Sequence, residues 1–290
     1  MRHSKAWCAV ILGFAACAPE GALEQAVRDR ISESGAEVVG FYYRDLGSDD
    51  ALLVDADVRM HAASTMKVPV MIQVFRDAEA GRLALDDSAT VRNEFTSIAD
   101  GSTYSLDMAD DSDSTLYGRV GGQATIRELV ELMITVSSNL ATNLLIEMVD
   151  GQRVTATMRE LGADSIEVLR GVEDIPAYRA GMSNTTTARD LGVIFAGIAD
   201  DRAASPGSCR EMREILLRQR FNEGIPAGLP PGTRVAHKTG VITRIHHDAG
   251  IVYDDVGSYV LVILVKGLDR EQDSAALMAD LSRYVAAERG

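Results

Sequence analysis

Lysine is scarce in this sequence. Its 290 residues include 29 lysines and arginines together, and only four are lysines, namely Lys5, Lys67, Lys238 and Lys266. A chain that almost always uses arginine for positive charge keeps lysine where a small amine able to lose its proton is needed. Lys67 and Lys238 lie in two short motifs, Ser64-Thr65-Met66-Lys67 and Lys238-Thr239-Gly240. Both are therefore candidate catalytic residues.

Cysteine is also scarce, with Cys8, Cys17 and Cys209 the only three. If the N-terminal segment is removed or lipidated on export, Cys209 is the one free thiol left and no intrachain disulfide can form. Stability must then come from packing. A chain of 290 residues with 46% hydrophobic composition can bury a substantial core, as one large domain or two closely packed ones.

Positive charge is in deficit overall. The formal net charge is -14 and the isoelectric point lies near 4.8. A polyanion would be repelled over most of such a surface, which argues against nucleic acid or an anionic membrane as a partner. Chemistry on a small molecule or a peptide is favoured instead.

The first 17 residues have the pattern of a signal peptide. A basic stretch, Met1–Lys5, precedes a short apolar run, Ala6–Ala16, which is too short to span a bilayer. Phe14-Ala15-Ala16-Cys17 resembles a bacterial lipoprotein box, in which Cys17 would carry the lipid. The alternative is ordinary cleavage near Ala18. Both predict an exported protein, either periplasmic or lipid-anchored to the bacterial envelope, with no membrane contact except a possible N-terminal lipid.

Hydrophobic periodicity predicts helices and strands in alternating blocks. Helices are expected at 20–34, 66–80, 125–149, 152–161, 187–199 and 270–287, and strands at 38–43, 51–54, 235–238, 249–253 and 259–265. A Ser- and Asp-rich stretch at 100–114, called the acidic segment below, is expected to be a surface loop.

This order predicts an α/β (α+β) fold. Strands at both ends of the chain would form one antiparallel sheet of about five strands, flanked by the terminal helices, with an all-helical lobe inserted. The catalytic domain would span 18–290. Its α/β lobe would comprise 18–63 and 206–290, and its helical lobe 64–205.

Ser64 opens the helix expected at 66–80, and Lys67 follows three residues later. Residues with this spacing lie on one helix face about one turn apart, so the amine can reach the hydroxyl. Backbone N–H groups at a helix N-terminus also stabilise negative charge. The motif is weak by itself, because a capped helix followed by a surface lysine has the same letters.

Two further motifs accompany it, Ser137-Ser138-Asn139 in a break of the stretch 125–149 and Lys238-Thr239-Gly240 at the end of a strand. Their order and spacing resemble those of the active-site serine penicillin-recognising enzymes, and among them the class A β-lactamases. The resemblance extends through the segments 125–129, 139–145 and 185–188 and covers nearly the whole mature chain. It implies the β-lactamase/transpeptidase-like fold and no metal or organic cofactor.

The resemblance also implies a role for each matching residue. Ser64 would attack an activated amide carbonyl after Lys67, as a neutral amine, removes its proton, with the pKa of Lys67 lowered by burial and by Lys238. Ser137 would protonate the departing nitrogen. Asn139 would bind the substrate's side-chain amide. Lys238 and Thr239 would bind the substrate carboxylate. The backbone N–H groups of Ser64 and of Val241, the residue after Gly240, would stabilise the oxyanion.

Deacylation would depend on an omega loop. The resemblance places its general base at Glu173, and Asn143 would brace the loop from a helix. The pattern departs from the family at three positions, because Ala177 replaces an asparagine and Gly171 and Asn184 replace a salt bridge. A fourth departure is Ser138, which stands where the family has a structural aspartate. Glu173 could alternatively be a solvated loop carboxylate, in which case turnover would be slow.

Two further residues are expected at the periphery of the site. Tyr104 resembles the family's tyrosine on the wall of the site. Arg244, or His247, stands where class A enzymes often place a cation for the substrate carboxylate, although a strand-edge or turn role is equally open. His246, His247 and Asp248 are not expected to bind zinc, because adjacent strand residues point to opposite faces.

We therefore predict a monomeric serine β-lactamase that hydrolyses the β-lactam amide through an acyl-enzyme on Ser64. One alternative is a D,D-peptidase-like hydrolase acting on peptidoglycan peptides. Another is an envelope domain that binds or senses penicillin and deacylates slowly.

Overall fold

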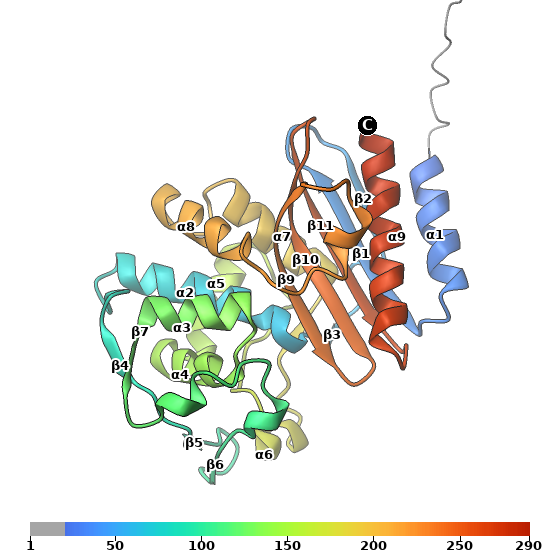
Figure 1. Cartoon of the computed structure of the whole chain (residues 1–290). Helices are drawn as coiled ribbons and strands as arrows, with labels where there is room; N and C mark the ends of the chain where they lie inside the picture. Colours follow the sequence, from blue (N-terminus) through green and yellow to red (C-terminus); the bar gives the residue numbers. More distant parts are fainter. Residues whose placement is uncertain (1–20) are drawn as a thin grey trace, which may run out of the picture.

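A five-stranded antiparallel sheet lies at the centre of the part of the chain that the computed structural model describes, residues 21–290 (Figure 1). Its strand order is β2-β1-β11-β10-β9. The strands are β1 (Val38–Asp45), β2 (Ala51–Val54), β9 (Arg234–Ile242), β10 (Ile245–Tyr253) and β11 (Ser258–Lys266). The expected sheet, built from both ends of the chain, is confirmed.

The pairing of β1 with β11 joins the two ends of the chain. It runs from Val38 opposite Lys266 to Asp45 opposite Tyr259. Five consecutive residues of β1, from Val39 to Tyr43, are buried. A strand covered on only one face would alternate, so this run shows that helices cover both faces of the sheet.

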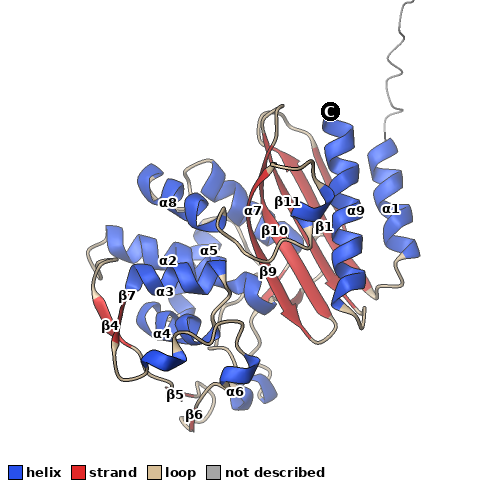
Figure 2. Ribbon diagram, in the orientation of Figure 1, coloured by secondary structure: helices blue, strands red, loops and turns tan. Residues whose placement is uncertain are grey.

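Helices α1 (Ala22–Glu33) and α9 (Glu271–Arg289) lie side by side on one face of the sheet, to the right of the strands in Figures 1 and 2. Helix α7 (Ala188–Ala199) packs on the other face, against β1, β10 and β11. Two hydrophobic cores result. The one beneath α1 and α9 is the smaller, and the one beneath α7 continues into the helical part of the molecule.

The helical part surrounds α2 (Lys67–Glu79), whose residues 67–75 are all buried. A helix that is apolar on every side needs packing partners all round. Its contacts are α3 (Ile126–Thr135), α4 (Asn139–Val149), α5 (Gly151–Glu160) and α8 (Pro206–Leu216). The stretch expected to be helical at 125–149 is therefore two helices, α3 and α4, separated at Ser137.

The remaining elements are short. They are β3 (Met60–His61), η1 (Ala63–Met66), β4 (Ser88–Thr90), β5 (Phe95–Thr96), β6 (Thr103–Tyr104), η2 (Met108–Asp110), η3 (Tyr117–Arg119), β7 (Gln123–Thr125), α6 (Ile175–Arg179), β8 (Thr185–Thr186) and η4 (Ile225–Gly228). The expected signal peptide at 1–17, with Cys17, lies outside the described residues. The lobe boundaries at 64 and 205 stay a prediction.

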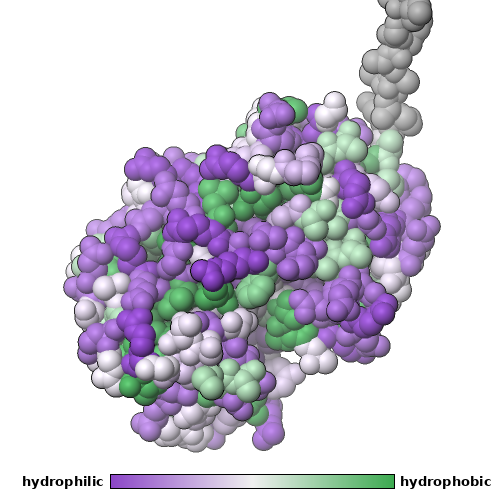
Figure 3. All heavy atoms as spheres, viewed as in Figure 1, coloured by the Kyte–Doolittle hydropathy of each residue, from purple (hydrophilic) through white to green (hydrophobic). Residues whose placement is uncertain are grey.

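The surface shown in Figure 3 is mostly hydrophilic, with hydrophobic residues visible in patches between the charged ones. Within residues 21–290 no helix is both long enough and apolar enough to cross a bilayer.

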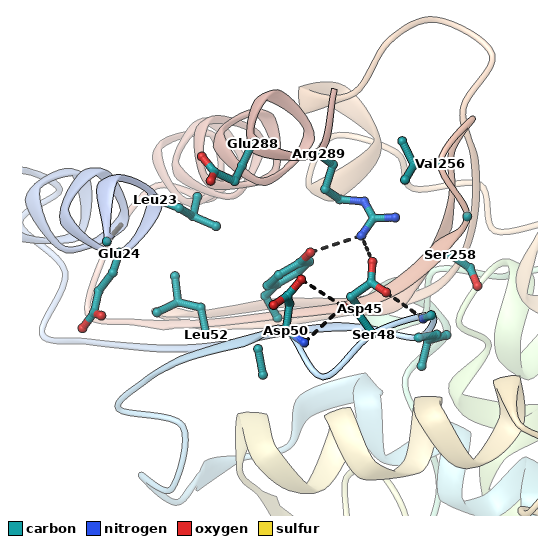
Figure 4. Close-up of a pocket in the computed structure, with 16 residues that line it drawn as sticks. Leu23, Glu24, Asp45, Ser48, Asp50, Leu52, Val256, Ser258, Glu288 and Arg289 are labelled. Atoms are coloured by element: carbon teal, nitrogen blue, oxygen red, sulfur yellow. Dashed lines mark hydrogen bonds and ion pairs between the residues drawn. The ribbon is translucent and has the colours of Figure 1, made fainter. Parts of the chain in front are cut away.

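The end of α9 is fixed to the sheet by a buried arginine, Arg289. Figure 4 shows Arg289 pointing toward Asp45 of β1, with which it forms an ion pair. It also pairs with Asp254 at 2.7 Å and donates to the Tyr43 hydroxyl at 3.1 Å. We call these four residues the C-terminal clamp. The cavity beside it, of about 860 Å3, is lined by α1, β1, β2 and α9 and contains none of the predicted site residues.

Candidate active site

Ser64 lies in η1, directly before α2 and against strand β9. The preceding residue, Ala63, has a left-handed φ of 45°. Gly240 of β9 allows the close approach, because a Cβ atom at this position would lie 2.9 Å from the backbone N of Ser64 and 3.1 Å from that of Thr65. Any side chain at 240 would push the strand away from the Ser64 amide.

Lys67 is fully buried at the start of α2. Its Nζ donates to the carbonyl oxygen of Ser137 at 2.6 Å and to Asn139 Oδ1 at 2.9 Å, and it lies 3.1 Å from Ser137 Oγ. In the described residues no hydrogen bond joins Lys67 to the Ser64 hydroxyl. The amine therefore faces the Ser137–Asn139 turn in this state, although Ser64 is only three residues away.

Ser137 connects two amines. Its Oγ lies 3.1 Å from Lys67 Nζ and 3.0 Å from Lys238 Nζ. Lys238 is fully buried on β9 and also donates to the carbonyl of Thr239 at 2.8 Å. Ser137 has a φ of 58°, a left-handed conformation that costs about 1–2 kcal/mol for a residue with a Cβ. We call Lys67, Ser137, Asn139 and Lys238 the lysine–serine cluster.

Burial changes the acid–base properties of both amines. It lowers the pKa of Lys67 to about 7, while the Asp111 carboxylate acts in the opposite direction. Burial, followed by repulsion from Lys67, holds the pKa of Lys238 well below its usual range. A neutral amine is thus available near neutral pH, as base catalysis requires.

A cavity of about 300 Å3 opens in front of the lysine–serine cluster. Four predicted site residues line it, namely Ser64, Ser137, Thr239 and Val241. The structure thus brings residues from η1, the α3–α4 turn and β9 to one cavity. These segments lie far apart in the sequence.

Asn143 of α4 holds the loop that carries Glu173. Its Nδ2 donates to the carbonyl of Val172 at 2.9 Å, and its Oδ1 accepts from the Val172 N–H at 2.6 Å. Gly171 permits this contact, because a Cβ there would lie 2.8 Å from Asn143 Oδ1 and 2.6 Å from the Tyr104 hydroxyl. A Cβ at position 171 would therefore require the Asn143 or Tyr104 side chain to shift.

Asn184 closes the base of the same loop. Its Oδ1 accepts from the N–H groups of Leu169 and Arg170 at 2.8 and 3.1 Å, and its Nδ2 donates to the carbonyl of Arg170 at 2.9 Å. These three bonds to the backbone close the base of the loop through a single side chain.

Glu173 is half-buried and adopts a left-handed φ of 62°. Burial raises the pKa of its carboxyl. Its Oε2 accepts from the backbone N–H of Asp107, in the acidic segment, at 3.2 Å. In residues 21–290 it makes no hydrogen bond to Ser64 or Lys67.

Tyr104 and Arg244 lie away from the catalytic cavity and from the lysine–serine cluster. Tyr104 is packed on Phe95 beneath the omega loop, with its hydroxyl 3.4 Å from Asn143 Nδ2, so it does not form the wall of the cavity. Arg244 occupies the tight turn between β9 and β10 with a φ of 58°.

The guanidinium of Arg244 pairs with Glu37 and Asp269 at 3.0 and 2.9 Å, at the edge of the sheet. This arrangement favours the strand-edge or turn role over substrate binding, because the partners of Arg244 lie just outside the ends of β1 and β11. His247, the alternative residue for this role, is buried and its Nε2 lies 3.0 Å from the carbonyl oxygen of His61, yet it is among the residues that line the catalytic cavity.

The sequence pattern did not reveal part of the cavity wall. Ser112 of the acidic segment lines the cavity, as do Glu223, His246 and Glu271. None stands in a motif. An exposed acidic stretch is usually a solvated loop, so no sequence signal would have distinguished this one.

Comparison with known proteins agrees with this geometry. A profile of the beta-lactamase enzyme family matches residues 22–288. A beta-lactamase of Streptomyces albus G is 27% identical over 264 residues, which cover 89% of this chain and 81% of that protein. The crystal structure of a beta-lactamase from Sphaerobacter thermophilus has a TM-score of 0.77 and 27% identity, covering 91% and 95% of the two chains.

A further similar structure is a mutant of PBP-A in an acyl-enzyme complex with penicillin G. Its TM-score is 0.79 at 28% identity, with 93% of this chain and 97% of that chain covered. These likenesses confirm the β-lactamase/transpeptidase-like fold and define a class A-like serine hydrolase. The chain belongs to the beta-lactamase enzyme family.

Proposed function

We propose that this protein is a serine β-lactamase that opens the β-lactam ring through an acyl-enzyme on Ser64. One observation carries the proposal. The Ser137 hydroxyl lies between two buried amines, 3.1 Å from Lys67 Nζ and 3.0 Å from Lys238 Nζ, at the back of a cavity that Ser64 lines. Such an array can move a proton between a nucleophile and a leaving nitrogen.

In the acylation step, Ser64 Oγ bonds to the carbonyl carbon of the lactam and its proton passes to the neutral amine of Lys67. The carbonyl C–N bond then breaks. Ser137 gives its proton to the departing nitrogen and regains one from Lys67, so that both the amine and the hydroxyl return to their starting states. The backbone N–H groups of Ser64 and Val241 would stabilise the oxyanion, a contribution of about 3–4 kcal/mol in comparable sites.

In the deacylation step, a water oxygen bonds to the ester carbonyl carbon while Glu173 accepts a proton from the water. The bond between this carbon and Ser64 Oγ then breaks, Ser64 takes the proton back from Glu173, and the ring-opened acid leaves. Half-burial and the raised pKa make Glu173 a stronger base than an ordinary carboxylate. Asn143 supports the loop from α4. Small-molecule β-lactams would be the substrates of a monomeric enzyme, which the N-terminal segment would export and a lipid on Cys17 would retain at the envelope.

A second function is favoured by one feature. Glu173 accepts a hydrogen bond from Asp107 and makes none to the catalytic residues within the described part of the chain. If this orientation persists after acylation, water stays unactivated and the protein is a slowly deacylating penicillin binder or a D,D-peptidase-like hydrolase.

Intact-protein mass spectrometry after brief exposure to benzylpenicillin tests acylation. The expected result is a transient adduct on the parent and none on Ser64→Ala. Absence of any adduct on the parent, with turnover also absent, would refute the proposal.

Stopped-flow hydrolysis of nitrocefin separates the two functions. A burst followed by sustained turnover marks a β-lactamase, whereas a burst without turnover marks the slow binder. Glu173→Gln should leave acylation intact and make the adduct persist. If Glu173→Gln turns over as fast as the parent, Glu173 is not the base.

A further inference from the structure

The acidic segment meets the catalytic residues at Asp111. One carboxylate oxygen of Asp111, Oδ2, accepts from the backbone N–H groups of Asn139 and Leu140, both at 2.9 Å, and Oδ1 also lies 2.9 Å from the Asn139 nitrogen. The Tyr117 hydroxyl donates to Oδ2 at 3.0 Å. A residue 28 positions upstream of Asn139 thus caps the helix that carries it.

Every N–H group at the start of α4 has a partner. The helix begins with four backbone donors that lack helical acceptors. Asp111 takes those of Asn139 and Leu140, the Ser138 side chain takes that of Ala141 at 3.3 Å, and the Ser138 N–H donates to the carbonyl of Leu132 at 3.0 Å. The Ser138 contact is the longest, so the carboxylate of Asp111 is the principal cap.

This cap lies beside the strained turn of the site. Ser137 has a left-handed φ, and both its carbonyl and its hydroxyl contact Lys67. A strained turn persists only where its surroundings hold it. Asp111 holds the backbone of Asn139, two residues after Ser137. Its negative charge also complements the positive N-terminal end of the α4 dipole.

We propose that Asp111 is a positioning residue for the acylation proposed above, holding Asn139 and the Ser137 turn in place and setting the charge balance around Lys67. Ser138, where the family has an aspartate, leaves this role open, and the acidic segment fills it from outside the motif. The inference rests on the proposed function.

The charged groups that face Lys67 are Asp111, from the acidic segment, and Lys238, from β9. The carboxylate favours the protonated amine. Neutralising it therefore shifts Lys67 toward the neutral form, so the acid limb of the acylation rate moves to lower pH. Loss of the cap should lower the maximal acylation rate, because Ser137 and Asn139 are then less well held.

The test compares Asp111→Asn with Asp110→Asn in the full chain. Asp110 is the adjacent exposed residue, and Asp110→Asn makes the same change of charge at a side chain without a hydrogen bond to α4. Acylation by nitrocefin is followed by stopped flow from about pH 5 to pH 9. For Asp111→Asn we expect a plateau about tenfold lower and a midpoint lower by about half a pH unit, and for Asp110→Asn nearly parental values.

A second readout does not need a β-lactam. Lysine labelled with 13C at Cε gives at most four NMR signals from this chain, because it has four lysines. Lys→Arg variants assign them, and the titration midpoint of Lys67 should fall in Asp111→Asn. If the parent is not acylated, the proposed function fails while this measurement still decides the inference.

Equal plateaus and midpoints for Asp111→Asn and the parent would overturn the inference, as would equal effects of the two Asn variants. If Asp111→Asn does not fold, Tyr117→Phe decides. It removes only the hydroxyl that donates to Asp111 and should lower the plateau about threefold. A parental plateau in Tyr117→Phe would then refute the positioning role.

Discussion

Acylation should depend on pH through Lys67. Burial lowers the pKa of Lys67 to about 7 from 10.5. The fraction of Lys67 that is a neutral amine, and so can act as a base, therefore increases as the pH rises. At a pKa of about 7 the neutral fraction is about 9% at pH 6 and about 91% at pH 8, a difference of about tenfold. The acylation rate constant, measured by stopped flow with nitrocefin under single-turnover conditions, should rise by the same factor.

Two variants test the assignment. Lys67→Arg keeps the positive charge but cannot supply a neutral base, so its acylation should fall by about a thousandfold or more at every pH. Lys266→Arg makes the same change at an exposed lysine and should keep the parental rate and profile. An acylation rate in the parent that varies less than twofold between pH 6 and pH 8, in protein shown to stay folded, would refute the reasoning.

Three other substitutions probe the site's surroundings. Gly240→Ala places a Cβ 2.9 Å from the Ser64 nitrogen and should slow acylation by about a hundredfold, as measured by penicillin labelling; a parental rate would argue against the oxyanion assignment. Asn184→Ala removes three hydrogen bonds at the base of the omega loop and should cost about 2–3 kcal/mol in urea unfolding and slow deacylation, whereas unchanged stability would contradict the loop-closing role. Arg244→Ala should leave acylation within twofold of the parent, and a tenfold loss would show that Arg244 reaches the substrate.

Periodicity predicted the elements that have continuous apolar faces. The strands β1 and β11 and the helix α2 are buried on several sides, so their sequences carry a strong signal. Helix α8 was not predicted. Yet Ser205 accepts a hydrogen bond from the Ser208 N–H and Pro206 occupies the first turn, which is a recognised start signal.

Motif spacing predicted the members of the lysine–serine cluster but not the direction of each side chain. The spacing of Ser64 and Lys67 suggested a direct contact, whereas the amine takes its acceptors from the Ser137–Asn139 turn. This set of hydrogen-bond acceptors depends on the strained backbone conformation of Ser137, between α3 and α4. Tertiary packing sets this conformation, and neighbouring residues in the sequence do not encode it.

Contacts made across the chain were the least predictable. Asp111 is one of several acidic residues in its segment, and its neighbours have the same composition and exposure pattern as a solvated loop. The path of the acidic segment across the folded helical part decides which carboxylate accepts hydrogen bonds from the N-terminal amides of α4. The same holds for Arg244, whose partners Glu37 and Asp269 are brought to it only by the completed sheet.

The C-terminal clamp has a consequence for how the chain reaches this structure. Val38 pairs with Lys266 and Arg289 pairs with Asp45, so β1 takes its central neighbour and its ion pair from residues that come much later in the sequence. Contacts between such distant segments make folding slow. The sheet and the C-terminal clamp can therefore form only once residues 258–289 are free to pack against β1, which makes their completion a late step of folding.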